Sequence, residues 1–365
     1  MMQLPQTLQQ VDRTQVILKG RKLSYFAGCD YFRLASHPQV LKAVEAGLRK
    51  YGLNVSASRM TTGNHELYGK LEEQLAEYFG VEAALLASNG YAPNLMVAQA
   101  LSGQYTHALL DERAHGCLVD AAYLLDCPVI RYKHRDVNDL EQILRQLGNI
   151  EPIILTDGIF SHDGSIAPLK EILKHLSGRG MILLDDAHGA GVLGKKGRGT
   201  PEHLDVPRKQ IIQTITLSKA FGSYGGAVLG ARPIVRTIIG KSRLFIGNTP
   251  LPLPLASGGI AAVGLLKKDA SFRARLKANS AKVKEPLLKK GLTVGSLSSP
   301  ILPVIPKTAV QAESLKKRLL TAEIYPSFIK YPGGPENGYF RFVISSEHTP
   351  KQLDNLLEVL LSSLT

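Results

Sequence analysis

Three polar segments of the sequence directly follow apolar, strand-like runs, and they contain the residue types that carry chemistry. The run Ile211–Leu217 leads into Ser-Lys219-Ala-Phe-Gly, and the run Met181–Leu184 leads into Asp185-Asp-Ala-His188-Gly. A third run, Ile153–Thr156, leads into Asp-Gly-Ile-Phe-Ser-His-Asp-Gly. Functional residues of parallel α/β sheets gather at the carboxyl ends of strands. We therefore expect chemistry at these three places.

Lys219 is a candidate for covalent catalysis. Its position after an apolar strand keeps the ammonium near low-dielectric surroundings, which depress the pKa of a lysine and free its amine to form an imine. The alternative is an ordinary lysine whose stem follows the strand and whose charge reaches solvent. Lys219 alone does not decide between the two.

Asp185 and His188 give the lysine a chemical context. An enzyme that uses pyridoxal 5′-phosphate (PLP) needs a carboxylate beside the pyridinium nitrogen, since a protonated ring accepts the electrons of a carbanion. Asp185 and Lys219 follow successive strands, as such a pair requires. His188 is a candidate ligand of the cofactor's phenolate or of a substrate carbonyl. The alternatives are that Asp185 or Asp186 caps a turn and that His188 is a turn histidine.

The turn Ser88-Asn89-Gly90-Tyr91 is a candidate phosphate site. It closes the strand-like run Ala83–Ala87 and begins a helix, where backbone N–H groups are exposed to anions. Thr216 and Ser218 flank the lysine and offer further hydroxyl groups. Turns of this composition are common, so this pattern is not specific by itself.

Two other kinds of site are disfavoured. The segment Gly189-Ala-Gly-Val-Leu-Gly194-Lys-Lys196 nearly matches a nucleotide-binding P-loop, but Lys196 stands where Ser or Thr belongs and no helix can follow. A metal site from His162, Asp163, Asp185 and His188 lacks a paired histidine spacing such as HExxH. We expect no metal.

The elements that must position these residues alternate between strand and helix. From about Ser36 to Ala231, apolar runs alternate with amphipathic stretches such as Leu67–Phe79 and Val137–Leu147, which is typical of a parallel α/β sheet. The Pro-rich stretch 249–254 interrupts regular structure, and an α+β pattern follows it. We expect an N-terminal segment over 1–35, a large domain over 36–248 and a small domain over 249–365.

Composition limits the class of protein. The chain has 365 residues with 44% hydrophobic residues, enough to bury a large core, and it contains no signal-peptide pattern or membrane-length apolar stretch. Its three cysteines form no disulfide framework, which suits a reducing cytoplasm. The net charge of +13 indicates basic residues on solvated helix faces or a binding site for an anionic small molecule. Nucleic acid is a less suitable partner, because the basic residues form no nucleic-acid-binding motif. We expect a cytoplasmic protein without membrane contact.

Taken together and in order, the motifs resemble the α-oxoamine synthases, which are fold-type I PLP enzymes. The resemblance runs from about Tyr25 to Leu361 and is closest in look to the 8-amino-7-oxononanoate synthases. Its specific parts are Asp157–Gly164, Leu184–Gly194 followed by Gly-Arg-Gly, and Thr216–Gly222 followed by a Gly pair. The implied fold has a mostly parallel sheet in the large domain and a smaller α+β C-terminal domain.

The resemblance implies a role for each matching residue. Lys219 resembles the Schiff-base lysine, Asp185 the pyridinium partner, His188 the phenolate-side ligand and His115 the histidine that stacks on the cofactor ring. Arg341 resembles the arginine that clamps the substrate carboxylate, as a bidentate guanidinium can. The other implied cofactor contacts are Gly90, Tyr91, Ser161, Thr216 and Thr249.

The implied reaction is the decarboxylative condensation of an amino acid (alanine, glycine or serine) with an acyl-CoA, carried out by a homodimer. Lys219 would also take the α-proton, and a basic surface would suit CoA. Alternatives on the same scaffold are an aminotransferase, an aldolase or a non-catalytic partner protein. The sequence departs from the family at Cys29, where a substrate-contacting Asn is usual, and at Tyr68, where a His is usual. These departures leave the choice of both substrates open.

Overall fold

The computed structural model of the protein describes residues 6–10, 12–330 and 335–364. Residues 1–5 and 11 of the predicted N-terminal segment therefore lie outside the described residues. By its contacts the chain divides into two compact units, each described here by itself. The larger unit comprises residues 37–160 and 166–270, and the smaller unit comprises residues 1–36, 161–165 and 271–365.

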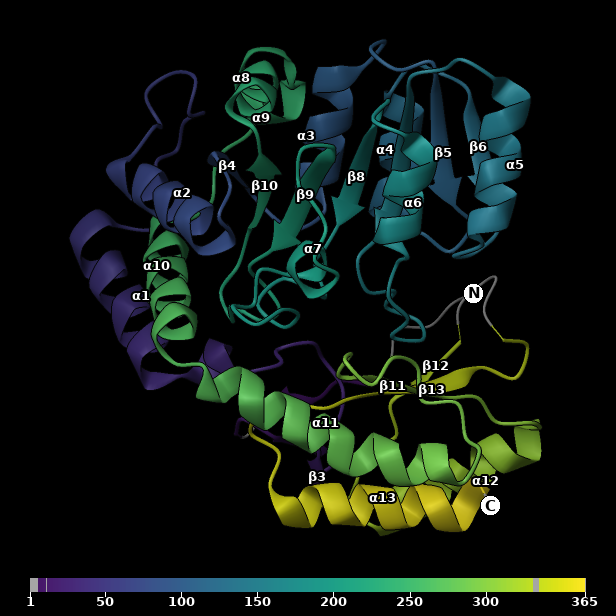
Figure 1. Cartoon of the computed structure of the whole chain (residues 1–365). Helices are drawn as coiled ribbons and strands as arrows, with labels where there is room; N and C mark the ends of the chain where they lie inside the picture. The colour runs from purple at the N-terminus through teal and green to yellow at the C-terminus, as the bar shows by residue number, and fades with distance from the viewer. Residues whose placement is uncertain (1–5, 11, 331–334, 365) are drawn as a thin grey trace. The chain divides into compact units, whose positions relative to one another are not determined.

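The larger unit is built on a mixed sheet that has seven strands in the described part of the chain. All neighbouring pairs are parallel except those of β10, which runs antiparallel to both β4 and β9. The order across the sheet, of which Figure 1 labels every strand except β7, is β4 (Ala83–Ala87), β10 (Gly226–Gly230), β9 (Ile211–Thr216), β8 (Met181–Asp185), β7 (Pro152–Asp157), β5 (His107–Asp111) and β6 (Val129–Tyr132).

Both faces of this sheet are buried by helices, which explains why its strands are nearly continuous apolar runs. Alternate strand residues contribute to two separate cores. Leu155 and Leu183 belong to the core that includes residues of α3 (Ala92–Leu101), α4 (Gly116–Leu124) and α8 (Arg232–Lys241). Ile154 and Leu184 belong to the core that includes residues of α5 (Val137–Leu147) and α6 (Leu169–Leu176).

Three further helices of the larger unit pack together. The helix α10 (Leu253–Lys268) contacts both α1 (Pro38–Tyr51) and α2 (Glu66–Phe79). This packing places α10 in the larger unit, whereas the predicted boundary after residue 248 assigns it to the C-terminal domain. The Pro-rich stretch interrupts the chain for a shorter distance than its composition indicates, because Pro254 is accommodated in the first turn of α10. The short helices α7 (Thr200–His203) and α9 (Arg243–Gly247) complete this unit.

The smaller unit combines two antiparallel sheets with three helices among the described residues. Its core joins Phe26 from the N-terminal part to residues of all three helices, so the ends of the chain fold into one unit. One sheet has the order β1 (Gln9–Gln10), β2 (Gln15–Leu18) and β3 (Arg21–Ser24), and the other β11 (Ile301–Val304), β13 (Tyr339–Val343) and β12 (Phe328–Ile329). The helices are α11 (Ser271–Lys289), α12 (Ala309–Thr321) and α13 (Pro350–Leu364); a 3-10 turn, Leu34–Ser36, ends the N-terminal part.

The predicted α/β architecture, with a mostly parallel sheet and a smaller C-terminal α+β part, is confirmed. None of the helices within the described ranges combines the length and the apolar character needed to cross a bilayer.

Candidate active site

A cavity of about 160 Å³ lies within the larger unit, where β8 and β9 end. It brings together most of the residues that the sequence predicts for the site, although they come from distant parts of the chain. The lining residues are Gly90, Tyr91, His115, Cys117, Asp157, Asp185, Ala187, His188, Thr216 and Lys219. The parallel register explains this convergence, because Asp157 and Asp185 are paired at the ends of neighbouring strands.

Lys219 and His188 form a direct pair at this cavity. The lysine Nζ lies 2.8 Å from His188 Nε2. His188 is only 6% exposed, so its ring is held in one place beside the amine. The structure thus supports a role for both residues at one reacting centre.

Asp186 anchors the loop that carries His188. Its carboxylate is fully buried and accepts hydrogen bonds from Thr200 N at 2.8 Å, Thr200 Oγ1 at 2.6 Å and Gln213 Nε2 at 2.6 Å. Burial raises the pKa of Asp186 to about 6, although these donors act in the opposite direction. Asp186 is therefore the structural carboxylate of the pair, and Asp185 is the one that faces the cavity.

Both carboxylate oxygens of Asp185 accept hydrogen bonds. Its Oδ2 accepts hydrogen bonds from Asn94 Nδ2 at 2.9 Å and from the Cys117 thiol at 3.0 Å. Its Oδ1 accepts one from the backbone N–H of Ala187 at 3.0 Å. The carboxylate is 5% exposed, so it is a fixed and largely desolvated group at the base of the cavity.

Asp157 lies beside Asp185 on the next strand. Burial, followed by the charge of Asp185, holds the pKa of Asp157 well above its usual range. Its Oδ2 accepts a hydrogen bond from the backbone N–H of His115 at 2.9 Å. Asp157 therefore positions the segment that presents His115.

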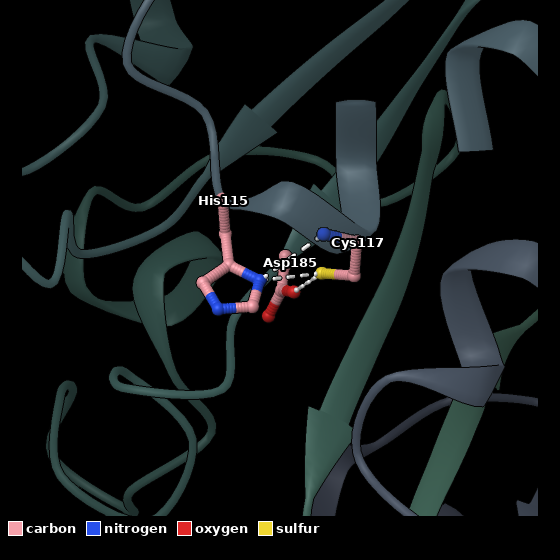
Figure 2. Close-up of side chains that lie close together, drawn as sticks. All are labelled: His115, Cys117 and Asp185. Carbon is pink, nitrogen blue, oxygen red and sulfur yellow. Dashed lines mark hydrogen bonds between the residues drawn. The ribbon is translucent and has the colours of Figure 1, made fainter. Parts of the chain in front are cut away.

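His115 begins α4 and presents an exposed ring to the cavity. Its Nδ1 accepts a hydrogen bond from the Cys117 N–H at 3.3 Å, which fixes the ring at the start of the helix. Figure 2 shows the ring close to Cys117 and Asp185. Tyr91 approaches His115 edge-on with ring centroids 6.0 Å apart, and its hydroxyl donates to Asp120 at 2.6 Å.

Gly90 and Thr216 approach each other closely at the predicted phosphate side. A Cβ added to Gly90 would lie 2.5 Å from Thr216 Oγ1, which is too near for a side chain. The Asn89 side chain accepts from the N–H groups of Tyr91 and Ala92 at the start of α3. The turn can approach Thr216 this closely only because residue 90 is glycine.

Thr249 does not line this cavity. It is exposed and lines a separate cavity of about 20 Å³ in the same unit, together with Ser88 and Asn248. The Asn248 Nδ2 donates to Ser88 Oγ at 3.0 Å. The cofactor contact of Thr249 therefore stays a prediction.

Ser161 and Arg341 belong to the smaller unit. Arg341 projects from β13, and its Nη1 donates to the Ser161 carbonyl oxygen at 3.3 Å. The Nε of Arg341 is buried and has no hydrogen-bond partner among the described residues. The guanidinium therefore retains donor capacity for an anionic ligand.

Sequence reasoning assigned no role to Asn94, Cys117 or Asp157. Asp157 had a usable signal, because it ends the strand beside Asp185. Asn94 had a weaker one, because it and Gln99 are the two polar residues of the mostly apolar helix α3. Cys117 had none, since only the folded chain brings its thiol to Asp185.

The family to which these residues belong follows from comparison with known proteins. Residues 27–360 match the family described as aminotransferase class I and II. The chain belongs to this family. The 8-amino-7-oxononanoate synthase of Thioalkalivibrio sulfidiphilus (strain HL-EbGR7) is 37% identical over 348 residues, which cover 94% of this chain and 89% of the relative.

Solved structures of the family have the same fold. A serine palmitoyltransferase variant from S. paucimobilis with a bound PLP-myriocin aldimine matches with a TM-score of 0.91 at 26% identity, over 98% of this chain and 92% of that chain. The 8-amino-7-oxononanoate synthase of Francisella tularensis matches with a TM-score of 0.81 at 27% identity, over 94% of this chain and 98% of that chain. These matches confirm the predicted family, its fold type and PLP as its cofactor.

Proposed function

We propose that the protein is a PLP-dependent acyltransferase that condenses an amino acid with an acyl-CoA, with loss of CO2, in an 8-amino-7-oxononanoate synthase-like reaction. One observation carries the proposal. Asp185, which ends β8, and Lys219, which follows the neighbouring parallel strand β9, line a single cavity with His115 and His188. The names of the relatives support the same reaction, since the curated relatives at 32% to 37% identity are 8-amino-7-oxononanoate synthases.

The residues of this cavity fit PLP by their chemistry. Asp185 is a buried carboxylate suited to a protonated ring nitrogen, and Lys219 is an amine suited to an imine. The close approach of Gly90 and Thr216 leaves the backbone edge of the turn for the phosphate. When bound, PLP supplies an electron-withdrawing ring that stabilises negative charge on the carbon next to the amino nitrogen.

The protein's own groups then divide the work. Asp185, fixed by its three donors, holds a proton on the ring nitrogen. Lys219 would hold the cofactor covalently, and its amine would carry the α-proton of the amino acid. His188, 2.8 Å from the lysine Nζ, orients that amine and donates to oxygen where negative charge develops.

The substrate groups are bound by positive charge. Arg341 binds the carboxylate of the amino acid, since its Nε has no hydrogen-bond partner in the part of the chain that the structure describes. The net charge of +13 attracts the phosphates of CoA. Tyr68 contributes to the core rather than to a substrate, because it is fully buried and its hydroxyl donates to Leu251 O at 2.7 Å.

We also propose a homodimer that acts in the cytoplasm. Leu41 and Leu48 on α1 are 50% and 48% exposed, which supports an apolar surface for a second copy. The free cysteines Cys29, Cys117 and Cys127 are compatible with a reducing compartment.

The test of the function combines product analysis with cofactor attachment. The protein is incubated with alanine, glycine or serine and a panel of acyl-CoAs, while free CoA is measured and the product is identified by mass. We expect CoA release, CO2 release and an α-oxoamine from one substrate pair. Borohydride should fix PLP to Lys219, and the variant Lys219→Ala should lose both the adduct and the turnover.

Other outcomes would contradict the proposal in different ways. Formation of a keto acid without CoA release would indicate an aminotransferase, and cleavage of a β-hydroxy amino acid would indicate an aldolase. A protein that never takes up PLP would indicate a non-catalytic partner protein.

A further inference from the structure

We infer that Cys117 is a positioning residue for Asp185: its thiol, together with the Asn94 amide, fixes the carboxylate in the orientation that the cofactor's ring nitrogen requires. This inference rests on the proposed function, because it assigns a role toward bound PLP. The thiol is not in contact with a substrate in this scheme. It acts through Asp185.

The first support is the geometry around one oxygen. Asp185 Oδ2 accepts from the Cys117 thiol at 3.0 Å and from Asn94 Nδ2 at 2.9 Å. Cys117 is 1% exposed and Asn94 is fully buried, so water does not compete for this oxygen. Two buried donors on one carboxylate oxygen restrict rotation of the carboxylate about its Cβ–Cγ bond.

The second support is that Asn94 is itself oriented. Thr214 Oγ1 donates to Asn94 Oδ1 at 2.8 Å, which turns the amide N–H groups toward Asp185. Thr214 is the residue of β9 that is paired with Asp185 of β8. The orientation of the carboxylate is thus determined by two adjacent strands and by α3.

The third support is that Cys117 has the character of a donor. Burial, followed by the charge of Asp185, raises the pKa of the thiol far above its usual range. The thiol therefore keeps its proton across the physiological range. The backbone N–H of Cys117 donates to His115 Nδ1 while its thiol donates to Asp185, so this one residue connects the histidine to the carboxylate (Figure 2).

A metal site is the competing interpretation of the same atoms. One ligand atom each from His115, Cys117 and Asp185 lie within 4.8 Å of one another. A metal ion would require the thiolate of Cys117. The protonated thiol and the use of Asp185 for the cofactor favour the hydrogen-bonded arrangement.

The experiment compares Cys117→Ala, which removes the donor, with Cys117→Ser, which retains one. The matched control is Cys127→Ala, which removes a half-buried thiol that does not line the cavity. Each holoenzyme is measured for its kcat, its KM for the amino acid and the pH dependence of the visible absorbance of bound PLP. Only a role toward the cofactor would change the absorbance profile.

We expect Cys117→Ala to lower kcat by about tenfold to a hundredfold, because a hydrogen bond to a charged group is lost. Its KM for the amino acid should stay within about twofold, and the midpoint of the absorbance profile should move by about half a pH unit or more. Cys117→Ser should remain close to the wild type in both properties, and Cys127→Ala should be unchanged.

Two results would overturn the inference. One is a Cys117→Ala enzyme with the wild-type absorbance profile and kcat; the other is a Cys117→Ser enzyme as impaired as the alanine variant. If Cys117→Ala does not fold, Thr214→Val takes its place. This variant releases the Asn94 amide while keeping the shape of the residue 214 side chain, and it must shift the absorbance profile of bound PLP. Uptake of PLP by the wild type, with the borohydride adduct on Lys219, separates failure of this inference from failure of the proposed function.

Discussion

Gly90 lies at the proposed phosphate side of the site, where its lack of a side chain matters. Its missing Cβ leaves room for Thr216 Oγ1, which a methyl group would approach to 2.5 Å. Thr216 is 5% exposed and its hydroxyl donates to Gly225 O at 3.1 Å, so it cannot move away freely. The turn at Gly90 and Thr216 therefore together form the surface that an anion would contact.

Replacing Gly90 with Ala should weaken PLP binding by about tenfold or more, because the turn must shift away from Thr216. Gly69→Ala is the matched control, since Gly69 lies within α2 and its added methyl would meet nothing within 4 Å. That control should bind PLP normally and be more stable by about 0.5–1 kcal/mol. PLP titration by absorbance measures the affinity, and equal affinities for both variants would contradict the assignment of Gly90.

The sequence predicts the individual residues of the site where their chemistry follows a strand. Asp185, His188 and Lys219 were found in this way, and all three line the cavity. Asn94 carries only a weak sequence signal and Cys117 carries none, because a buried donor is recognised chiefly by the acceptor that folding brings to it. Their acceptor is Asp185, which is 91 and 68 residues away along the chain.

At the scale of elements, the long periodic segments were predicted to within a few residues. The predicted Val137–Leu147 is α5, and the predicted strand Met181–Leu184 is β8 with one residue added. The antiparallel strand β10 was not predicted, because Gly226–Gly230 is short and rich in glycine. Its direction depends on pairing with β4 and β9, which no local pattern specifies.

His348 connects β13 to α13 in the smaller unit and is buried in its neutral form. Its Nδ1 accepts from the Ser345 N–H at 2.9 Å, its Nε2 lies 3.0 Å from Tyr25 O, and its ring stacks on Phe26. Burial, followed by the charge of Arg33, lowers the pKa of His348 to about 3. A proton on Nδ1 would remove the acceptor of the Ser345 N–H and place two N–H groups against each other.

The protein should therefore lose stability in acid through this histidine. The unfolded chain binds the proton near the ordinary pKa of 6.5, whereas the folded chain binds it only near 3, so the contribution is present above 6.5 and is lost as the pH falls through this window. The loss is about 1.4 kcal/mol per pH unit below that point.

Urea unfolding of the wild type and His348→Gln at about pH 7 and about pH 5 measures this difference. Between these conditions the wild type should lose about 2 kcal/mol more free energy of unfolding than the variant. The exposed His203 offers a control, and His203→Gln should follow the wild type. If the wild type and His348→Gln lost equal free energies of unfolding, the pKa of His348 would not differ between the folded and the unfolded chain.

At the scale of the whole molecule, the division of the chain into two compact units is the feature that local sequence patterns predict least well. The described residues before α1 join the C-terminal part through a shared core that includes Phe26, and α10 joins the larger unit through α1 and α2. Both assignments depend on packing between segments that are distant in sequence. Net charge, in contrast, is a property of the whole chain that the sequence states directly.

The excess of 44 basic over 31 acidic residues gives the protein a positive field at neutral pH. Such a field raises the local concentration of an anionic substrate and is screened by salt over about 10 Å at 0.1 M. We therefore expect kcat/KM for an acyl-CoA to fall by about three- to tenfold between about 0.03 M and about 0.3 M KCl. An acyl thioester of N-acetylcysteamine, which lacks the phosphates, should show little change, and so should the KM for the zwitterionic amino acid. If the uncharged thioester lost as much activity as the acyl-CoA, salt would be acting on the protein itself, and the basic surface would have no part in binding CoA.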